Sequence, residues 1–177
     1  SRYSLAPSYG APQASREPYA LTVLGEILGA ERTGRLHRAL VMGDGPAVAV
    51  SAWYQGTGLD HGTFGFAGRP RNGTELRALE AAIDRVIAEL LERGVTDEEL
   101  ERAKRGLQAS AIFARDSIST AARIFGSALT TGSPVADVEA WPERIEAVTA
   151  AEVLDAARKV LDPRRSVTGY LLPKPTT

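Results

Sequence analysis

Residues 33–54, TGRLHRALVMGDGPAVAVSAWY, place two arginines, a histidine, an aspartate and three glycines within one short segment. Glycine-rich turns can hold a phosphate on backbone N–H groups, and His37 with Asp44 could act as base and acid. The same residue types are also typical of a simple bend between a helix and a strand. The elements around the segment decide between these alternatives.

A phosphate-binding loop of the dinucleotide type needs three glycines that follow a strand and open a helix. Here Gly43 and Gly45 follow a helical pattern and precede a strand pattern, and Val48 stands at the place of the third glycine. The order of elements is therefore reversed. We expect Gly43 to end the helix and residues 44–46 to form a turn that binds no phosphate.

The two histidines do not have the spacing of a metal site. A helical zinc-binding pair is separated by three or four residues, whereas His37 and His61 lie far apart in different predicted elements. Neither H-E-x-x-H nor the inverted H-x-x-E-H occurs. We expect His37 on a helix surface, His61 in a hairpin loop, and no metal ligand in this chain.

The sequence also lacks the pattern of a nucleophilic hydrolase. There is no cysteine and no G-x-S-x-G motif. Asp60, His61 and a loop serine could be assembled into a triad, but adjacent residues at a strand end point in different directions. The prediction is that the chain holds no catalytic and no cofactor-binding residue.

Composition places the chain among ordinary globular proteins. It has 177 residues, 44% of them hydrophobic and 24% charged. A net charge of −1 argues against a nucleic-acid partner, and no apolar run is long enough to span a membrane. We expect residues 1–177 to form a single domain. Because the chain opens with Ser and at once with a strand pattern, we expect it to be a fragment of a longer chain.

Four segments have strand patterns. Residues 2–7 stop at a proline, which predicts an edge or terminal strand. Residues 47–54 and 62–68 are joined by the turn formers of a hairpin loop, and glycines 65 and 68 predict a bulge or a close backbone approach. Residues 165–173 are the predicted closing strand.

The remaining segments have helical periodicity. They are residues 18–28, 34–41, 76–93, a long segment of 97–131, two short helices near 135–140 and after Trp141-Pro142, and 150–161. Thr96 with Glu99 and Thr149 with Glu152 predict capping boxes at two of the helix starts. Strands at both ends and in the middle, with helices between them, predict an α+β fold: an antiparallel sheet with helices packed on one face.

Two polar groups in the long helical segment have ordinary explanations. In residues 97–105, Glu98–Arg102 and Glu101–Arg105 are spaced as ion pairs on a solvated helix face. Four polar residues within five positions predict a bend in the helix, because their side chains compete for the backbone. They are Asp116, Ser117, Ser119 and Thr120.

Three stretches resemble the second domain of the pitrilysin/insulinase family of zinc metallopeptidases, which includes the mitochondrial processing peptidases. They are LTVLGEILGAERTGRLHRAL, GVTDEELERAKRGLQAS and VTAAEVLDAARKVLDPRRSVTGYLLP. The first matches the family pattern of an apolar helix, an LG stop and a second helix opened by GRL. The resemblance implies a half-domain of that family, in the order of elements given above.

In that family a peptidase half has two similar α+β domains, and only the first carries the zinc motif. The resemblance therefore implies that zinc belongs to the preceding domain of the parent protein. Two halves close like a clamshell over an unfolded peptide, which adds as a strand to a sheet edge. In the half opposite the zinc, an Arg and a Tyr normally stabilise the oxyanion, and Val41 and Val48 occupy their positions here.

Two roles follow from the resemblance. The first is a non-catalytic C-terminal domain that walls the peptide chamber and contacts the zinc-bearing domain and the partner half. In this role, either another half supplies the Arg and Tyr, or the half that contains this domain is degenerate and wholly non-catalytic. The bend at residues 116–120 is then either part of the chamber wall or a solvated kink. The second role is a scaffold subunit of the same fold without peptidase activity. An independent hydrolase using His61 is a third possibility, and exported bacterial relatives favour the periplasm.

Overall fold

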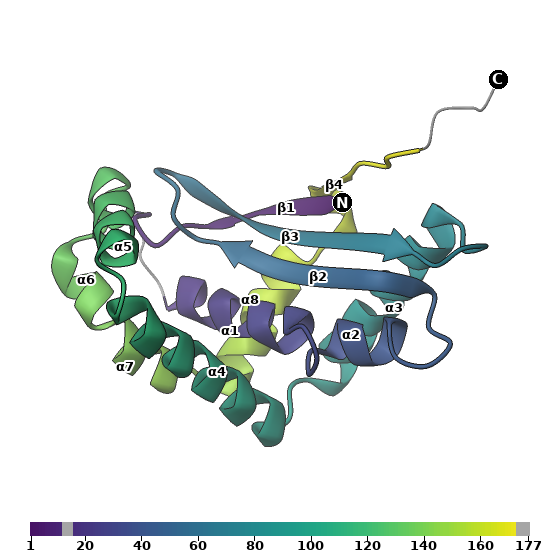
Figure 1. Cartoon of the computed structure of the whole chain (residues 1–177), viewed down its shortest axis with the longest axis horizontal. Coiled ribbons are helices and arrows are strands. Elements are labelled where there is room, and N and C mark those ends of the chain that lie inside the picture. Colours follow the sequence, from purple (N-terminus) through teal and green to yellow (C-terminus); the bar gives the residue numbers. More distant parts are fainter. Residues whose placement is uncertain (12–15, 173–177) are drawn as a thin grey trace.

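A four-stranded antiparallel sheet forms one layer of the protein, seen in a computed structural model that describes residues 1–11 and 16–172 (Figure 1). The strands lie in the order β2-β3-β1-β4. Their bounds are β1 Arg2–Pro7, β2 Ala47–Gln55, β3 His61–Pro70 and β4 Ser166–Thr168. The hairpin of β2 and β3 is confirmed, with one register irregularity between Ala47 and Ala49.

Eight α-helices lie among the described residues. They are α1 Glu17–Gly29, α2 Arg35–Leu40, α3 Leu76–Arg93, α4 Asp97–Arg115, α5 Ile118–Thr130, α6 Val135–Glu139, α7 Trp141–Glu146 and α8 Ala150–Val160. Figure 1 shows the helices on one side of the sheet, with α4 farther from it than α1 and with α5 and α6 at one end. The predicted α+β fold with helices on one face is confirmed.

The core lies between the sheet and the helices because each element buries one side. In α1, Leu21, Leu24 and Leu28 belong to the apolar repeat of residues 18–28 and are fully buried, in one core cluster with Phe64 of β3. Removing side chains of this size from water is the main source of stability in such a core.

Glycines let α1 approach the outer edge of β2. A Cβ at Gly29 would overlap the backbone of Ala52, and one at Gly25 would lie 3.3 Å from the amide nitrogen of Tyr54. Neither position has room for a larger residue without moving backbone atoms. The helix therefore covers this part of the sheet edge.

The sequence predicts that residues 2–7 form an edge or terminal strand; they form the first strand of the chain, but the edge position is wrong. β1 pairs with β3 along its whole length and with β4 through Arg2, Tyr3 and Ser4. The alternation of its side chains shows which face is buried, but it contains no information on how many neighbours pair with the backbone. Pro7 is tolerated because it is the last residue of the strand.

The closing strand is shorter than predicted. β4 ends at Thr168, and of the predicted segment residues 169–172 are described without strand pairing, while residue 173 lies outside the described residues. The phenol of Tyr170 instead donates a hydrogen bond to Glu80 of α3, which also accepts from Arg2 and Thr168. Backbone pairing continues only at Gly169, which exchanges two hydrogen bonds of 2.8 Å with Ser1, and Tyr170 is held by its side-chain bond to α3.

The long helical segment of 97–131 is two helices and not one bent helix. α4 ends at Arg115, and Ser117 begins α5 by accepting a hydrogen bond from the backbone N–H of Thr120 at 3.3 Å. Both predicted capping boxes, at Thr96 and at Thr149, are present. The cap at Ser117 gives the chain a complete new helix start at the predicted bend.

Candidate functional site

The turn between α2 and β2 contains the residues that suggested chemistry. α2 ends at Leu40 and Gly43 has a φ of +61°, which favours glycine. A Cβ at Gly45 would overlap the carbonyl of Leu40, so this glycine is required by the tight turn. Asp44 is exposed between them. The predicted turn is confirmed.

Val41 and Val48 flank this turn with apolar side chains. Val41 is half-buried against the core, and its carbonyl oxygen accepts a hydrogen bond from Arg71 at 3.4 Å. Val48, on β2, is 45% exposed. Neither side chain carries a hydrogen-bond donor, so neither can stabilise an oxyanion as an Arg or a Tyr would.

The histidines lie apart in the structure. His37 is half-buried on α2, as predicted, whereas His61 opens β3 and is not a loop residue. The imidazole Nε2 of His61 lies 3.5 Å from Asp60, and both side chains are exposed. Within residues 1–11 and 16–172, no three His, Cys, Asp or Glu side chains are placed to hold a metal ion. The described residues therefore do not fit a zinc ion.

A serine does come near Asp60 and His61, without forming a triad. The hydroxyl of Ser8 is buried and donates to the backbone carbonyl oxygen of Asp60 at 3.0 Å. A nucleophile needs its hydroxyl bonded to the base, and here the hydroxyl proton is used by a main-chain acceptor. This arrangement closes a loop and has no catalytic geometry.

The charged face of α4 differs in one pair from the prediction. Glu98 and Arg102 form the expected ion pair at 2.6 Å. Glu101 does not pair with Arg105 but with Lys104, whose ammonium lies 3.3 Å from the carboxylate. The stem of Lys104 is buried, so its ammonium reaches the exposed carboxylate on the same turn.

The polar residues at the end of α4 serve the helix boundary. Ser117 caps α5, its hydroxyl lies 3.1 Å from that of Ser119, and Asp116 is the exposed residue that ends α4. The hydrogen bonds of this group are local to the break between α4 and α5.

Large apolar side chains are exposed beside this break. The apolar repeat of residues 97–131 includes Ile118 and Leu129 and predicts that both lie on the inward stripe of one long helix. That prediction is wrong, because they are 89% and 57% exposed. The new start at Ser117 rotates α5 away from the core. The exposed set, here called the α4–α5 surface, comprises Ile112, Phe113, Ile118, Ile124, Leu129 and Val135.

The open face of the sheet is also apolar. Tyr3, Leu5 and Val167 are exposed there, and the indole of Trp53 packs against Tyr3 with ring centres 5.8 Å apart. Gly65 makes room for this indole, because a Cβ at Gly65 would lie 2.5 Å from it. The close approach predicted at Gly65 is therefore confirmed, between a glycine backbone and a side chain.

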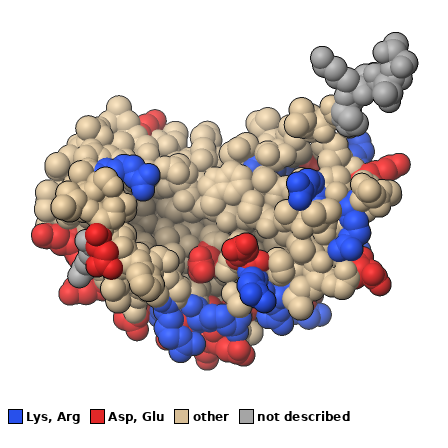
Figure 2. Space-filling view, viewed as in Figure 1, with Lys and Arg blue, Asp and Glu red and all other residues tan. Residues whose placement is uncertain are grey.

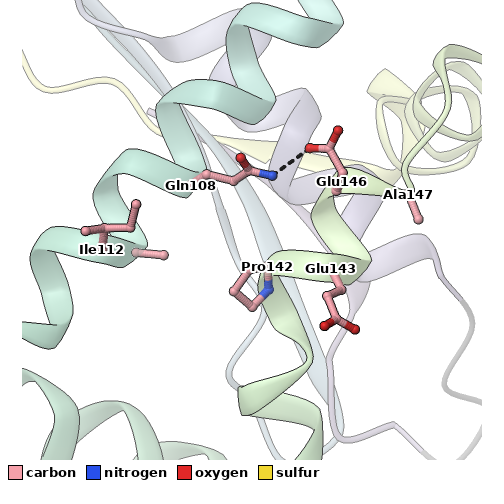
Figure 3. A pocket seen from close by; sticks show the side chains of 7 residues that line it. Gln108, Ile112, Pro142, Glu143, Glu146 and Ala147 are labelled. Carbon is pink, nitrogen blue, oxygen red and sulfur yellow. Dashed lines mark hydrogen bonds between the residues drawn. The ribbon is translucent and has the colours of Figure 1, made fainter.

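A cavity of about 540 Å³ lies between α4 and α7, next to the α4–α5 surface. Figure 3 shows Ile112 and Pro142 on its walls and the carboxylates of Glu143 and Glu146 on α7. The amide of Gln108 donates to Glu146 at 2.6 Å. The cavity is open and offers acceptors and apolar surface, but it contains no paired nucleophile and base.

Sequence comparison decides what kind of domain carries these features. The sequence model described as the peptidase M16 inactive domain matches residues 4–107, more than half of the chain. The chain belongs to the peptidase M16 inactive domain family. The predicted resemblance to zinc metallopeptidases of the pitrilysin/insulinase type, and to their second domain, is confirmed. A comparison with curated protein sequences found no match.

Solved structures share the fold of this M16 inactive domain. A protease from Helicobacter pylori is 18% identical with a TM-score of 0.83; the match covers 93% of this chain and 38% of that one. The inactive peptidase domain of a candidate zinc protease from Bordetella parapertussis is 19% identical with a TM-score of 0.81. That match covers 99% of this chain and 93% of the Bordetella parapertussis chain. The chain thus equals one relative in extent and spans well under half of the other.

A chain of complex III from Candida albicans has the same fold. It is 16% identical with a TM-score of 0.71, and the match covers 94% of the M16 inactive domain and 41% of the fungal chain. The fold therefore occurs both in a protease and in a chain of complex III.

Proposed function

We propose that this M16 inactive domain is the non-catalytic, C-terminal domain of a zinc-dependent endopeptidase. In this role residues 1–177 form one domain of a longer chain. The domain packs beside a zinc-bearing domain, walls the chamber that holds an unfolded peptide, and contacts a second half that closes the chamber. Zinc is held by the other domain.

The observation that carries the proposal is the exposed apolar surface of a domain whose described residues hold no metal-ligand group. Contiguous apolar patches on a soluble protein mark interaction sites. The α4–α5 surface and the open sheet face around Trp53 are two such sets of exposed apolar side chains, on different elements. One domain with two apolar surfaces is suited to contact two neighbours.

The apolar side chains of Val41 and Val48 support a further part of the proposal. Because neither can donate a hydrogen bond to a reacting carbonyl, the Arg and Tyr come from a different half of the enzyme. This domain then belongs to the half that carries the zinc.

A scaffold role is the second candidate, and the complex III chain from Candida albicans favours it. In that case the same apolar surfaces contact neighbouring subunits, and no zinc-bearing domain is needed. The two candidates differ in what accompanies this domain in its parent protein.

Zinc content and peptide cleavage test the proposal. We expect the chain alone to bind no stoichiometric zinc by mass spectrometry and to leave a fluorogenic peptide uncleaved. The parent coding region should contain H-x-x-E-H before this domain, and its product should bind one zinc and cleave. Tightly held zinc with turnover in the chain alone would refute the proposal. A parent without H-x-x-E-H would favour the scaffold.

A further inference from the structure

We propose that the free edge of β4, together with the residues that follow it, pairs with the same segment of a second copy of this chain. The segment is residues 166–172, SVTGYLL, here called the β4 edge segment. Such pairing joins two four-stranded sheets into one continuous sheet across a two-fold axis. The inference concerns association between copies and goes beyond the proposed function.

The β4 edge segment has no strand or helix along its outer side. β4 is the last strand in the order β2-β3-β1-β4, so among the described residues only β1 pairs with it. At the opposite edge of the sheet, α1 lies against β2 at Ala52. Figure 1 shows the chain after β4 running away from both the sheet and the helices. An outer strand without a cover presents N–H and C=O groups that a further strand can bind.

The pairing with β1 determines which backbone groups of the segment are available. Ser1 and Gly169 exchange two hydrogen bonds of 2.8 Å. In an antiparallel ladder such bonded pairs alternate with unbonded ones. Gly169 and Val167 therefore direct their N–H and C=O groups towards β1, whereas Ser166 and Thr168 direct theirs to the outer side. These outward groups can form the ladder to a second copy.

The side chains indicate that the segment keeps the alternation of a strand beyond the end of β4. The hydroxyl of Thr168 donates to Glu80 at 2.9 Å, and the phenol of Tyr170 donates to the same carboxylate. Residues two positions apart thus point towards α3, as they do along a strand. The same alternation assigns Val167 and Leu171 to the opposite face. They are 75% and 92% exposed.

The β4 edge segment lacks the devices that usually keep a sheet edge from pairing. Natural edges carry charged side chains, prolines or bulges. No charged residue and no proline occurs from Ser166 to Leu172, and the register of β4 with β1 is regular. Valine, threonine and tyrosine favour strands. The net charge of the chain is only −1, so two copies repel each other weakly.

The segment is complementary to itself when two copies run antiparallel about Gly169. Val167 then lies opposite Leu171 of the second copy, apolar against apolar. Thr168 lies opposite Tyr170 of the second copy, and their outward backbone groups form a hydrogen-bonded pair. The two glycines meet at the axis, where no side chains collide. Because one segment pairs with itself, the contact closes at two copies and does not continue into a filament.

The size of the contact predicts a weak dimer. A standard stable interface uses about 20–30 residues a side, and the segment is much shorter. We expect a dissociation constant on the order of 100 μM. Sedimentation equilibrium between about 5 and about 500 μM should therefore show the average mass rising from one chain towards two.

Charges at two facing positions test both the interface and its register. Val167→Lys with Leu171→Lys places lysines opposite each other and should weaken association at least about tenfold. Val167→Glu with Leu171→Lys places opposite charges at the same positions and should associate at least about tenfold more tightly than the double-lysine variant. Leu59→Lys, at an exposed leucine of the β2–β3 loop, is the control and should dimerise like the parent.

Two further measurements keep the variants interpretable. Both charged variants alter exposed side chains, so their melting temperatures by circular dichroism should lie within about 2 °C of the parent at concentrations where all are monomeric. In the parent, hydrogen exchange followed by NMR should show the amide of Thr168 exchanging more slowly at about 500 μM than at about 5 μM, because pairing occupies this outward N–H.

A chain that stays monomeric at about 500 μM would overturn the inference, whether or not another protein binds the same edge. A dimer that is unchanged in the double-lysine variant would place the contact elsewhere and overturn it as well. Equal association of the two charged variants would contradict the register about Gly169. None of these results depends on zinc content or peptide cleavage, which test the proposed function separately.

Discussion

Single glycines set the closest contacts of this domain. Gly29 lies against the backbone of Ala52, so the helix and the strand edge cannot separate to admit a side chain without breaking the packing. Gly126 of α5 is also helical, but no atom lies within 4 Å of where its Cβ would be. Both glycines lie in α-helices, but only Gly29 has other atoms close to the position of its Cβ.

We predict opposite effects of alanine at these two positions. Gly29→Ala should lower the free energy of unfolding by about 2–3 kcal/mol, because the new methyl group overlaps backbone atoms. Gly126→Ala should raise it by about 0.5–1 kcal/mol through helix propensity. Urea denaturation followed by circular dichroism measures both. A neutral Gly29→Ala would show that α1 can move away from β2.

At the scale of single residues, the sequence predicted the chemical role of a side chain better than its exposure to solvent. The turn glycines 43 and 45 and the apolar residues at Val41 and Val48 could be assigned from residue type alone. The half-buried carboxylate of Glu26 could not, because its distinguishing feature is the missing partner on α4. That feature depends on which residue of a distant helix faces it, and here the residue is Gly106.

At the scale of elements, one ion pair joins α2 to the start of α4. Arg35 donates to both oxygens of Glu99 at 2.7 and 2.6 Å and to the carbonyl of Gly94. Burial opposes ionisation of Glu99, but the hydrogen bonds from Arg35 and from Thr96 outweigh it and lower the pKa of Glu99 to about 2. The lowered pKa means that folding favours the charged carboxylate.

The stabilisation by this pair should therefore depend on pH. It is complete above the unfolded pKa of about 4.5 and is lost as the pH falls towards 2. Glu99→Gln keeps a residue able to complete the capping box, and at pH 7 it should lower the free energy of unfolding by about 1–3 kcal/mol. The difference from the parent should disappear near pH 2. A constant difference between pH 7 and pH 2 would exclude the ion pair as its cause.

The cap of α5 permits a second test at this scale. Ser117→Ala removes the acceptor for the N–H of Thr120 and should cost about 1 kcal/mol, felt mainly by α5. Hydrogen exchange should show faster exchange in residues 118–130 and unchanged exchange in α1. Ser119→Ala, which removes a neighbouring hydroxyl but no cap, is the control. Equal effects of both variants would contradict the capping role.

Helix starts could be predicted because an N-terminal cap depends only on the types of about four consecutive residues. Thr96 with Glu99 and Thr149 with Glu152 are such signals, and both helices begin there. Strand partners could not be predicted in the same way. Whether β1 has one neighbour or two depends on residues 166–168, at the other end of the chain.

At the scale of the molecule, the α4–α5 surface leaves large apolar side chains in contact with solvent. Phe113 is 74% exposed and Ile118 is 89% exposed. Periodicity predicted that Ile118 is buried, because a helical repeat does not show where a helix is interrupted. If the proposed function holds, another domain or subunit covers this surface.

We predict that Phe113→Ser with Ile118→Ser weakens association without weakening the fold. The melting temperature of the chain should change by less than about 2 °C, because exposed side chains contribute little to folding. Binding to the zinc-bearing domain, measured by sedimentation velocity, should weaken at least about tenfold. Leu59→Ser, at an exposed leucine of the β2–β3 loop, should leave binding unchanged. Unchanged binding in the double variant would place the interface elsewhere.

The pairing of β1 with both β3 and β4 fixes an order of events during translation. Within this chain, residues 2–7 emerge from the ribosome before every other element, yet they lie inside the sheet. One side of β1 pairs with β3 and the other with residues 166–168, so this part of the sheet closes only after residues 166–168 have been made. A polypeptide truncated after Val160 would present β1 as a bare edge, with Tyr3 and Leu5 beside it, ready to pair with another nascent chain.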